Sequence, residues 1–410
     1  MALINDTDKF LFYRYVVKEF YIIIGSKTIK LDTEQVLGFT IVDDYMKNLF
    51  PVFRVQLGLP ESTYYKIIRN KEDVQFKIYL QAYYTKNTLR TKSTYTKIIN
   101  DVYSLILDDD DEFLSQDANK AEYPNGDEKN MNAVTTAAEF FLFKKTLLKN
   151  TRKVVNTILK KCTVSTAFMY LFSKLGIKNL LMKKIDSGAN SEQTIVFPPF
   201  RIPDAIQWLD TYYGSYATGS MIYLGLTKSY MLPFGGCQTV FESGERKYVC
   251  IIVPKIGGNA TDSICQLSKK GDTQKYYVIA DPQSFSPNNE TTTSSIIEEE
   301  GLETVDTESD ANGSSTDNIR YTSKKGYNPF TESVYAAQKK SGESVIEVFL
   351  KDINMNIITP NKIYQFLFED TSLSKKYKGK YFLCSREIMI TKESKYYTLG
   401  MICNFRKFIN

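Results

Sequence analysis

Alternation of apolar and polar residues predicts strands in the first hundred residues. One alternating run has its apolar positions at Phe53, Val55, Leu57 and Leu59. A longer run has them at Val74, Phe76, Ile78, Leu80 and Ala82. Because successive side chains of a strand point to opposite faces, each run predicts a strand with one face on a core and the other on solvent or a partner. Between the runs, Pro60 and residues 64–68 predict one short helix.

Helical spacing replaces this alternation between residues 150 and 185. Residues recur there at three- and four-residue steps, at Val154 or Val155, then Ile158, Cys162, Ser165, Phe168, Phe172 and Leu175. This period predicts a helix that ends at Gly176, the natural C-cap residue. A second helix is predicted from Pro203, which suits a first helical position, to Gly214.

The apolar faces of these two helices are expected to meet. Phe172 would then pack against Ile206 and Leu209 of the second helix. Trp208 is expected near the surface of this helical unit or against a neighbouring chain.

Strand patterns return after residue 217 and dominate the end of the chain. Continuous apolar runs occupy residues 248–253 and 275–280. Alternating positions follow at Val345, Phe349, Tyr364, Phe366, Phe368, Tyr381, Leu383, Tyr397, Leu399, Met401, Cys403 and Phe405. Several short strands at this spacing predict a small barrel.

Two polar segments interrupt these patterns. The run Asp108, Asp109, Asp110, Asp111 and Glu112 opens a polar stretch that reaches about residue 132. Its carboxylates lack the spacing of an EF-hand calcium loop, so a solvated insertion is predicted. Residues 286–320 hold no aromatic residue and many Ser, Thr and Asn, which predicts a disordered or extended loop.

The composition excludes several kinds of chemistry. The chain has no histidine, which removes the usual general base, the imidazole metal ligand and every histidine-dependent nucleophile. Its six cysteines form no CxxC pair, so neither a zinc module nor any cofactor is predicted. A net charge of +5 from 52 basic and 47 acidic residues predicts no nucleic-acid recognition. The apolar stretch 10–24 is interrupted by charges, which predicts neither a membrane span nor a signal peptide.

Three groups of segments, taken in their order along the chain, resemble the baseplate hub proteins of tailed bacteriophages. The first group comprises residues 42–45 leading to 50–53, then 64–68 and the strand from Val74. The second comprises residues 170–179, 197–200, 205–210 and 213–214. The third comprises residues 363–368 and 377–381. The resemblance covers about half of the chain, and each segment is a packing pattern rather than a chemical motif.

The resemblance implies an α+β, mainly β fold with two small tail-tube-like β-barrels and an inserted helical domain. The expected domains are 1–145, an N-terminal barrel with an acidic insertion near 108–132; 146–215, the helical insert; 216–335, a strand-containing middle region with the loop 286–320; and 336–410, a C-terminal barrel. The two barrels are expected to share one topology and to be built from residues 1–100 and 340–410.

The function implied is structural. Three chains with two barrels each would form a pseudo-six-fold ring that joins the six-fold tail tube to the three-fold central spike. The implied partners are two further copies of the chain, the tube protein, the spike protein and other baseplate proteins. No catalytic, cofactor or metal residue is expected, and the protein would be folded and assembled in the host cytoplasm for the baseplate of the virion. Expected interface residues are Phe53, Val55, Tyr79, Trp208, Tyr364, Phe366 and Tyr381.

Three other functions stay open at this stage. A tail-tube subunit or spike-type adaptor would need only one barrel. A tail-tip wall hydrolase would need two paired carboxylates, for which Glu242, Glu245 and Asp281 are candidates that nothing in the pattern pairs. A carbohydrate- or receptor-binding tail protein would fit the 29 Tyr and 25 Phe residues.

Overall fold

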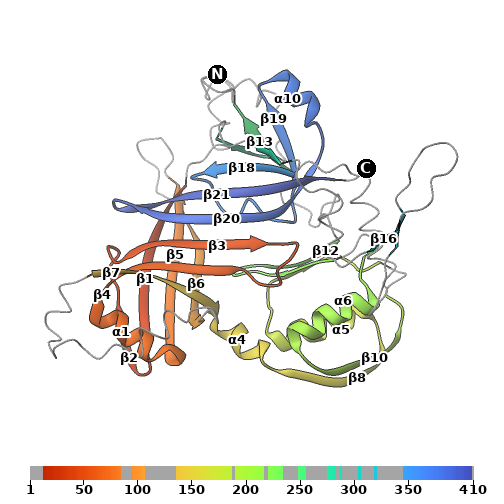
Figure 1. Ribbon diagram of the computed structural model, residues 1–410, viewed down its shortest axis with the longest axis horizontal. Helices are drawn as coiled ribbons and strands as arrows, with labels where there is room; N and C mark the ends of the chain where they lie inside the picture. The colour runs from red at the N-terminus through yellow and green to blue at the C-terminus, as the bar shows by residue number, and fades with distance from the viewer. Residues whose placement is uncertain are drawn as a thin grey trace.

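The computed structural model shows a mainly β protein with a small helical unit at one side (Figure 1). It describes residues 13–84, 94–106, 135–186, 190–216, 220–233, 248–254, 275–281, 286–288, 303–305, 318–320 and 345–408. The predicted fold class, α+β and mainly β with barrels and a helical insert, is confirmed. The acidic stretch 108–132 and most of the loop 286–320 lie outside the described residues.

Eight described strands close the first barrel. They are β1 (Tyr13–Ile24), β3 (Val36–Asp44), β4 (Val52–Pro60), β5 (Val74–Tyr84), β6 (Thr94–Ile106), β7 (Thr135–Lys144), β20 (Tyr381–Glu393) and β21 (Tyr396–Lys407). Their order around the barrel is β20-β3-β4-β7-β6-β5-β1-β21, and the β20–β21 pairing closes the ring. Every neighbouring pair is antiparallel. Strand β2 (Lys27–Lys30) pairs with β1 outside the ring.

The inward faces of these strands are the apolar positions that alternation marks. Phe53 and Val55 of β4 are buried, and so are Phe76 and Ile78 of β5. The predicted short helix is confirmed as α1 (Glu61–Arg69), which joins β4 to the 3₁₀ turn η2 (Lys71–Asp73) before β5. The barrel core therefore follows from period-two patterning, because only one face of each strand can be removed from water.

A second ring of strands lies beside the first (Figure 1). It adds β13 (Tyr248–Val253), β14 (Lys275–Ile279), β18 (Val345–Lys351) and β19 (Ile363–Phe368) to β20 and β21. A bridge between Ala280 and Leu350 brings the end of β14 back to β18. The short strand β15 (Ser286–Asn288) pairs with β18. Helix α10 (Thr371–Lys376), capped by the Asp370 side chain, connects β19 to β20.

The two rings share the long β20–β21 hairpin. Tyr381 at the start of β20 pairs with Tyr364 of β19, whereas residues from Ser385 onward pair with β3. A register shift between Leu383 and Ser385 marks the point where β20 passes from one ring to the other. Bulges bend strands in this way and increase their local twist. The N-terminal barrel is therefore closed by C-terminal strands.

The expectation of one topology for both barrels is wrong for the described strands. The first ring is wholly antiparallel, but β13 runs parallel to both β14 and β19. Parallel neighbours need long crossover connections. The pattern of apolar positions cannot report this, because it is the same for both strand directions.

The helical unit contains more strand than its spacing predicts. Its elements are α4 (Lys145–Thr151), β8 (Val154–Cys162), α5 (Val164–Leu175), β9 (Leu180–Met182), β10 (Gln193–Arg201), α6 (Ile202–Tyr213), β11 (Ser220–Leu224) and β12 (Ser229–Pro233). The predicted helix is wrong for residues 154–162, which pair antiparallel with β10. This segment is rich in β-branched residues such as Val155, Thr157 and Ile158, which favour strands once a partner strand satisfies their backbone.

The two predicted helices and their contact are confirmed. The Thr163 side chain caps α5 by accepting a hydrogen bond from the Thr166 N–H. Gly176 ends α5 in the left-handed conformation, with φ of 82°. The apolar faces of α5 and α6 form one buried core that includes Phe168, Phe172, Leu175, Ile206 and Leu209. No helix among the described residues is long and apolar enough to cross a membrane.

Candidate functional site

A buried ion pair lies where the N-terminal and C-terminal strands meet. Arg386 of β20 and Asp43 of β3 are directly paired in register, and the Arg386 Nε donates to the Asp43 Oδ2 at 2.6 Å. Only 11% of the arginine side chain and 4% of the aspartate side chain are exposed. A buried pair is stable only when its remaining donors and acceptors are also satisfied.

The arginine also holds a loop of the second ring. Its Nη1 donates to the backbone carbonyl oxygen of Met355 at 2.8 Å and to that of Ile358. Both carbonyls belong to the connection between β18 and β19. Tyr15 of β1 contacts the same connection, since its hydroxyl donates to the Ile353 carbonyl at 2.7 Å and accepts from the Met355 N–H. This connection is therefore fixed by polar side chains of both rings.

Two tyrosines complete the environment of Asp43. The Tyr45 hydroxyl donates to Oδ2 at 3.3 Å, and the Tyr223 hydroxyl donates to Oδ1. Tyr223 lies on β11 of the helical unit, so all three parts of the protein meet at this carboxylate. Burial and the negative Asp43 raise the pKa of Tyr223, which keeps its hydroxyl a donor at neutral pH.

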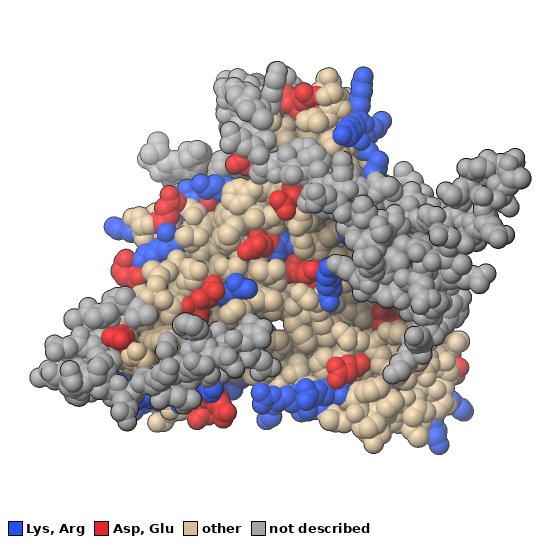
Figure 2. Space-filling model, in the orientation of Figure 1, with Lys and Arg blue, Asp and Glu red and all other residues tan. Residues whose placement is uncertain are grey.

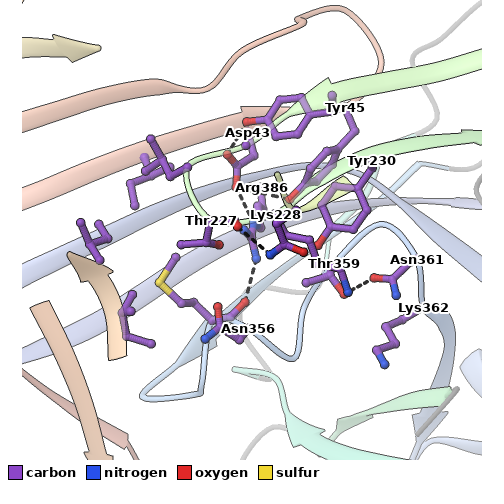
Figure 3. A pocket seen from close by; sticks show the side chains of 18 of the residues that line it. Asp43, Tyr45, Thr227, Lys228, Tyr230, Asn356, Thr359, Asn361, Lys362 and Arg386 are labelled. Carbon is purple, nitrogen blue, oxygen red and sulfur yellow. Dashed lines mark hydrogen bonds and ion pairs between the residues drawn. The ribbon is translucent and has the colours of Figure 1, made fainter. Parts of the chain in front are cut away.

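A cleft opens beside this junction (Figure 3). Its volume is about 350 Å³. Residues from β3, β6, the turn between β11 and β12, and the β18–β19 connection line it. The described charged residues that line it are Asp43, Lys97, Lys228, Lys362 and Arg386. A register shift between Leu80 and Gln81 of β5 leaves Ile98 of β6 as an extra residue, next to Lys97 at the rim.

The described residues bring no catalytic pair of carboxylates together in this cleft, because Asp43 is its one acidic lining residue. Of the hydrolase candidates, Glu242 and Glu245 lie outside the described residues. Asp281 is exposed just after β14, where its backbone N–H donates to the Phe349 carbonyl. The described part of the chain also holds no group of three or more His, Cys, Asp or Glu residues that would suit a metal ion.

Most of the expected interface residues lie inside a single chain. Those with at most 7% exposure are Phe53, Val55, Tyr364, Phe366 and Tyr381. Their side chains form the cores of the two rings, where they offer little surface to a neighbour. Tyr79 and Trp208 retain partial exposure. Alternation thus places five of the seven expected residues at inward positions and Tyr79 at an outward one.

Neither member of the ion pair stands out from its own segment as a functional residue. Asp43 belongs to a segment that supports the hub resemblance, but as part of a packing pattern. Arg386 lies in the strand of Leu383 and Ile388, at a position that alternation alone would assign to either face. The one sequence feature that could have identified Arg386 is its charge within a strongly apolar strand. A charged residue in such a strand indicates a buried position only when a partner of opposite charge is known.

A polar junction thus unites two strand rings and a helical unit in one mainly β protein built from fused barrels. The sequence model of the bacteriophage PBS1 gene 109 protein family matches residues 15–281. The chain belongs to this family, which confirms the phage origin implied by the resemblance. No curated protein matches the chain.

Solved structures with a similar outline include phage tail proteins. A tail protein from Neisseria meningitidis has 9% identity and a TM-score of 0.46, with 96% of each chain covered. A 43 kDa tail protein of prophage MuSo2 from Shewanella oneidensis has 7% identity and a TM-score of 0.42, with 94% of this chain and 96% of that one covered. The Francisella PdpA-VgrG complex has 7% identity and a TM-score of 0.41, over 97% of this chain and 58% of that one. TM-scores below 0.5 do not by themselves establish a common fold.

Proposed function

We propose that this protein is a structural baseplate hub protein, a trimer that joins the six-fold tail tube of a phage to its three-fold central spike. The observation that supports this most is the fusion of two strand rings through one hairpin, β20–β21. Three such chains supply six rings around one axis. A trimer of this kind meets a six-fold neighbour on one side and a three-fold neighbour on the other.

The buried junction suits this role. A subunit between two symmetries must hold its two rings at a fixed relative position, or the six rings would not close. The Asp43–Arg386 pair links β3 to β20, and the Arg386 Nη1 links both to the β18–β19 connection. The Tyr223 hydroxyl adds the helical unit to the same point. The role proposed is therefore mechanical rather than catalytic.

Outward apolar residues supply surfaces for neighbours. Trp208 is partly exposed and lies beside partly exposed Phe200 and exposed Tyr212, at ring distances of 6.0 and 5.3 Å. The outer face of the β8–β10 ribbon exposes Ile158 and Val196, which pair directly across the two strands. Exposed apolar patches of this kind mark contact sites in proteins that assemble. Tyr79 on the outer face of β5 and the Trp208 group are proposed to face neighbouring chains or other baseplate proteins.

The charge on the viewed surface is consistent with protein partners. Figure 2 shows acidic and basic side chains interspersed over the barrels, with Lys and Arg gathered along the lower edge near α4. Exposed basic residues on α4 and directly after it are Lys145, Lys149, Arg152 and Lys153. Acidic patches on baseplate neighbours would complement this edge.

The copy number in virions tests the proposal. Quantitative mass spectrometry of purified phage, calibrated on the major tube protein, is expected to give three copies per tail. Electron microscopy of the tail is expected to place the protein between tube and spike, in the assembled virion rather than free in the host. Six copies per tail, or absence of the protein from virions, would contradict the hub role.

A further inference from the structure

The two-stranded ribbon of β8 and β10 has an edge that no described strand covers. Within the described part of the chain, β8 pairs with β10 alone. Figure 1 shows β8 as the outermost strand of the helical unit, with α5 and α6 on the inner side of the ribbon. An uncovered strand edge presents a row of backbone donors and acceptors to which a further strand can add.

The backbone hydrogen bonds of β8 identify which of its residues face this edge. The Ile202 N–H donates to the Lys153 carbonyl oxygen at 3.1 Å, so the backbone groups of Lys153 point to the β10 side. In an extended strand the N–H and C=O of one residue point to the same side, and the side alternates from residue to residue. The register shift within this stretch adds its extra residue to β10 and leaves the alternation of β8 intact. Val154, Asn156 and Ile158 therefore present their backbone groups to the open edge.

The opposite edge of the ribbon is less suited to a further strand. Pro198 and Pro199 lie in β10 and have no backbone N–H to donate. Proline is one of the means by which proteins keep a strand edge from pairing. Because β8 contains no proline, its own edge keeps every donor.

The side chains along β8 combine apolar and basic character. Val154 and Ile158 are 60% and 56% exposed. Exposed Lys153 precedes the strand, and exposed Lys160 and Lys161 lie near its end. Every charged residue from position 145 to position 161 is basic. An acidic segment would therefore complement both ends of this strand.

The same charges disfavour a second copy of β8 as the occupant of the edge. Two copies paired in either direction would bring basic ends together, and like charges opposite one another destabilise a strand pair. Lysine on an edge strand is a common defence against such self-pairing. A segment with carboxylates at its ends and apolar residues between them meets no such repulsion.

We propose that the open edge of β8 takes up an acidic, extended segment of another tail protein as a third strand of the ribbon. The backbone of this segment would pair along residues 154–158, and its carboxylates would lie near Lys153, Lys160 and Lys161. Strand addition of this kind takes its affinity from main-chain hydrogen bonds and its specificity from side chains. The proposal rests on the baseplate role for the kind of partner, whereas the binding itself needs one chain alone.

Fluorescence anisotropy with labelled peptides tests the proposal on the purified full chain. The probe is a peptide of about ten alternating valine and glutamate residues. One control peptide has the same residues with all glutamates at one end, and a second alternates valine with lysine. Saturable binding of the probe is expected, weakened by added sodium chloride, with both controls at least about tenfold weaker.

Variants of β8 separate the strand edge from its charge. Asn156→Pro removes one outward N–H and is expected to weaken binding of the probe at least about tenfold. Asn156→Ala keeps this N–H and is expected to bind like the unchanged chain. Lys160→Glu with Lys161→Glu is expected to reverse the preference, so that the valine–lysine peptide binds better than the probe. Misfolding cannot produce such a reversal, and circular dichroism verifies the fold of each variant.

Several results would overturn the proposal. One is the absence of saturable binding of the probe, and another is equal binding by Asn156→Pro and Asn156→Ala. Binding of phosphatidylglycerol vesicles in place of the probe would assign the basic strand to a membrane surface instead. Self-association of the chain that Asn156→Pro abolishes would assign the edge to a second copy. The peptide results do not depend on the copy number in virions, so failure of the hub role and failure of this proposal are distinguishable.

Discussion

Asp43 and Arg386 are 343 residues apart in the chain, yet their side chains form an ion pair of 2.6 Å between adjacent strands. This contact ties the first ring to the hairpin that the second ring also uses. One ion pair between residues distant in the sequence thus connects an N-terminal strand and a C-terminal strand, which alternation of apolar residues predicts only as separate strands.

Removal of this carboxylate should destabilise the protein strongly. Asp43→Ala leaves a buried guanidinium uncompensated and removes the acceptor of the Tyr45 and Tyr223 hydroxyls, so a loss of about 3–5 kcal/mol is expected. Urea unfolding followed by circular dichroism measures it. Glu139→Gln is the control, because Glu139 pairs with Arg54 at 3.7 Å on the surface and is expected to lose less than about 1 kcal/mol. Equal losses in the two variants would show that the buried pair has no special role.

Deletion of the C-terminal strands should unfold the N-terminal barrel. A chain ending at residue 344 lacks β20 and β21, which leaves β1 and β3 without their ring neighbours. Unpaired strand edges aggregate, so no cooperative unfolding transition is expected from this fragment. Co-expression with residues 345–410 is expected to restore it. Cooperative thermal unfolding of residues 1–145 alone would instead support the contiguous barrel that the predicted domain boundaries describe.

The core between the two helices should be sensitive to truncation. Phe172 is 1% exposed and stacks on Phe168 at 6.0 Å. Phe172→Ala is expected to cost about 3–5 kcal/mol, since it leaves a cavity between α5 and α6. Met169→Ala is the matched control on the same helix, where the side chain is 49% exposed and the expected change is within about 0.5 kcal/mol. A small loss for Phe172→Ala in chemical denaturation would mean that the cavity collapses.

Asp210 should make stability depend on pH. Burial raises its pKa above the ordinary 3.8, although hydroxyl hydrogen bonds from Ser220 and Ser215 act in the opposite direction. The folded state therefore binds the proton more tightly than the unfolded state. As pH rises from 3.8 through the folded pKa, this group lowers the free energy of unfolding.

The substitution Asp210→Asn isolates this effect. Both hydroxyls donate to Oδ1, which an asparagine retains. The variant is expected to gain stability relative to the unchanged chain between pH 4 and pH 7, because it carries no proton to lose. Unfolding free energies at the two pH values provide the test, and Glu192→Gln removes the same charge from an exposed position. Parallel pH profiles for Asp210→Asn and the unchanged chain would refute the prediction.

The sequence by itself predicted those helices and strands whose formation depends on residues close together in the chain. Period-two alternation located β4, β5 and the C-terminal strands together with their inward faces, because a strand presents alternate residues to one core. Capping residues located the ends of α5 and α6 for a similar reason, since Gly176 and Gly214 act within one turn of the helix they end. Among the expected interface residues, those at inward positions are buried within the chain itself.

Tertiary structure alone decided which strands share a ring. Strand pairing is made by backbone hydrogen bonds, which leave no residue signature of the partner, so nothing in β3 identifies β20 as its neighbour. The same reason explains the error at β8, whose strand state depends on pairing with β10. It also explains why the Asp43–Arg386 pair and the cleft beside it appear only in the folded chain. Charges so far apart in sequence become a site only when the hairpin joins both rings.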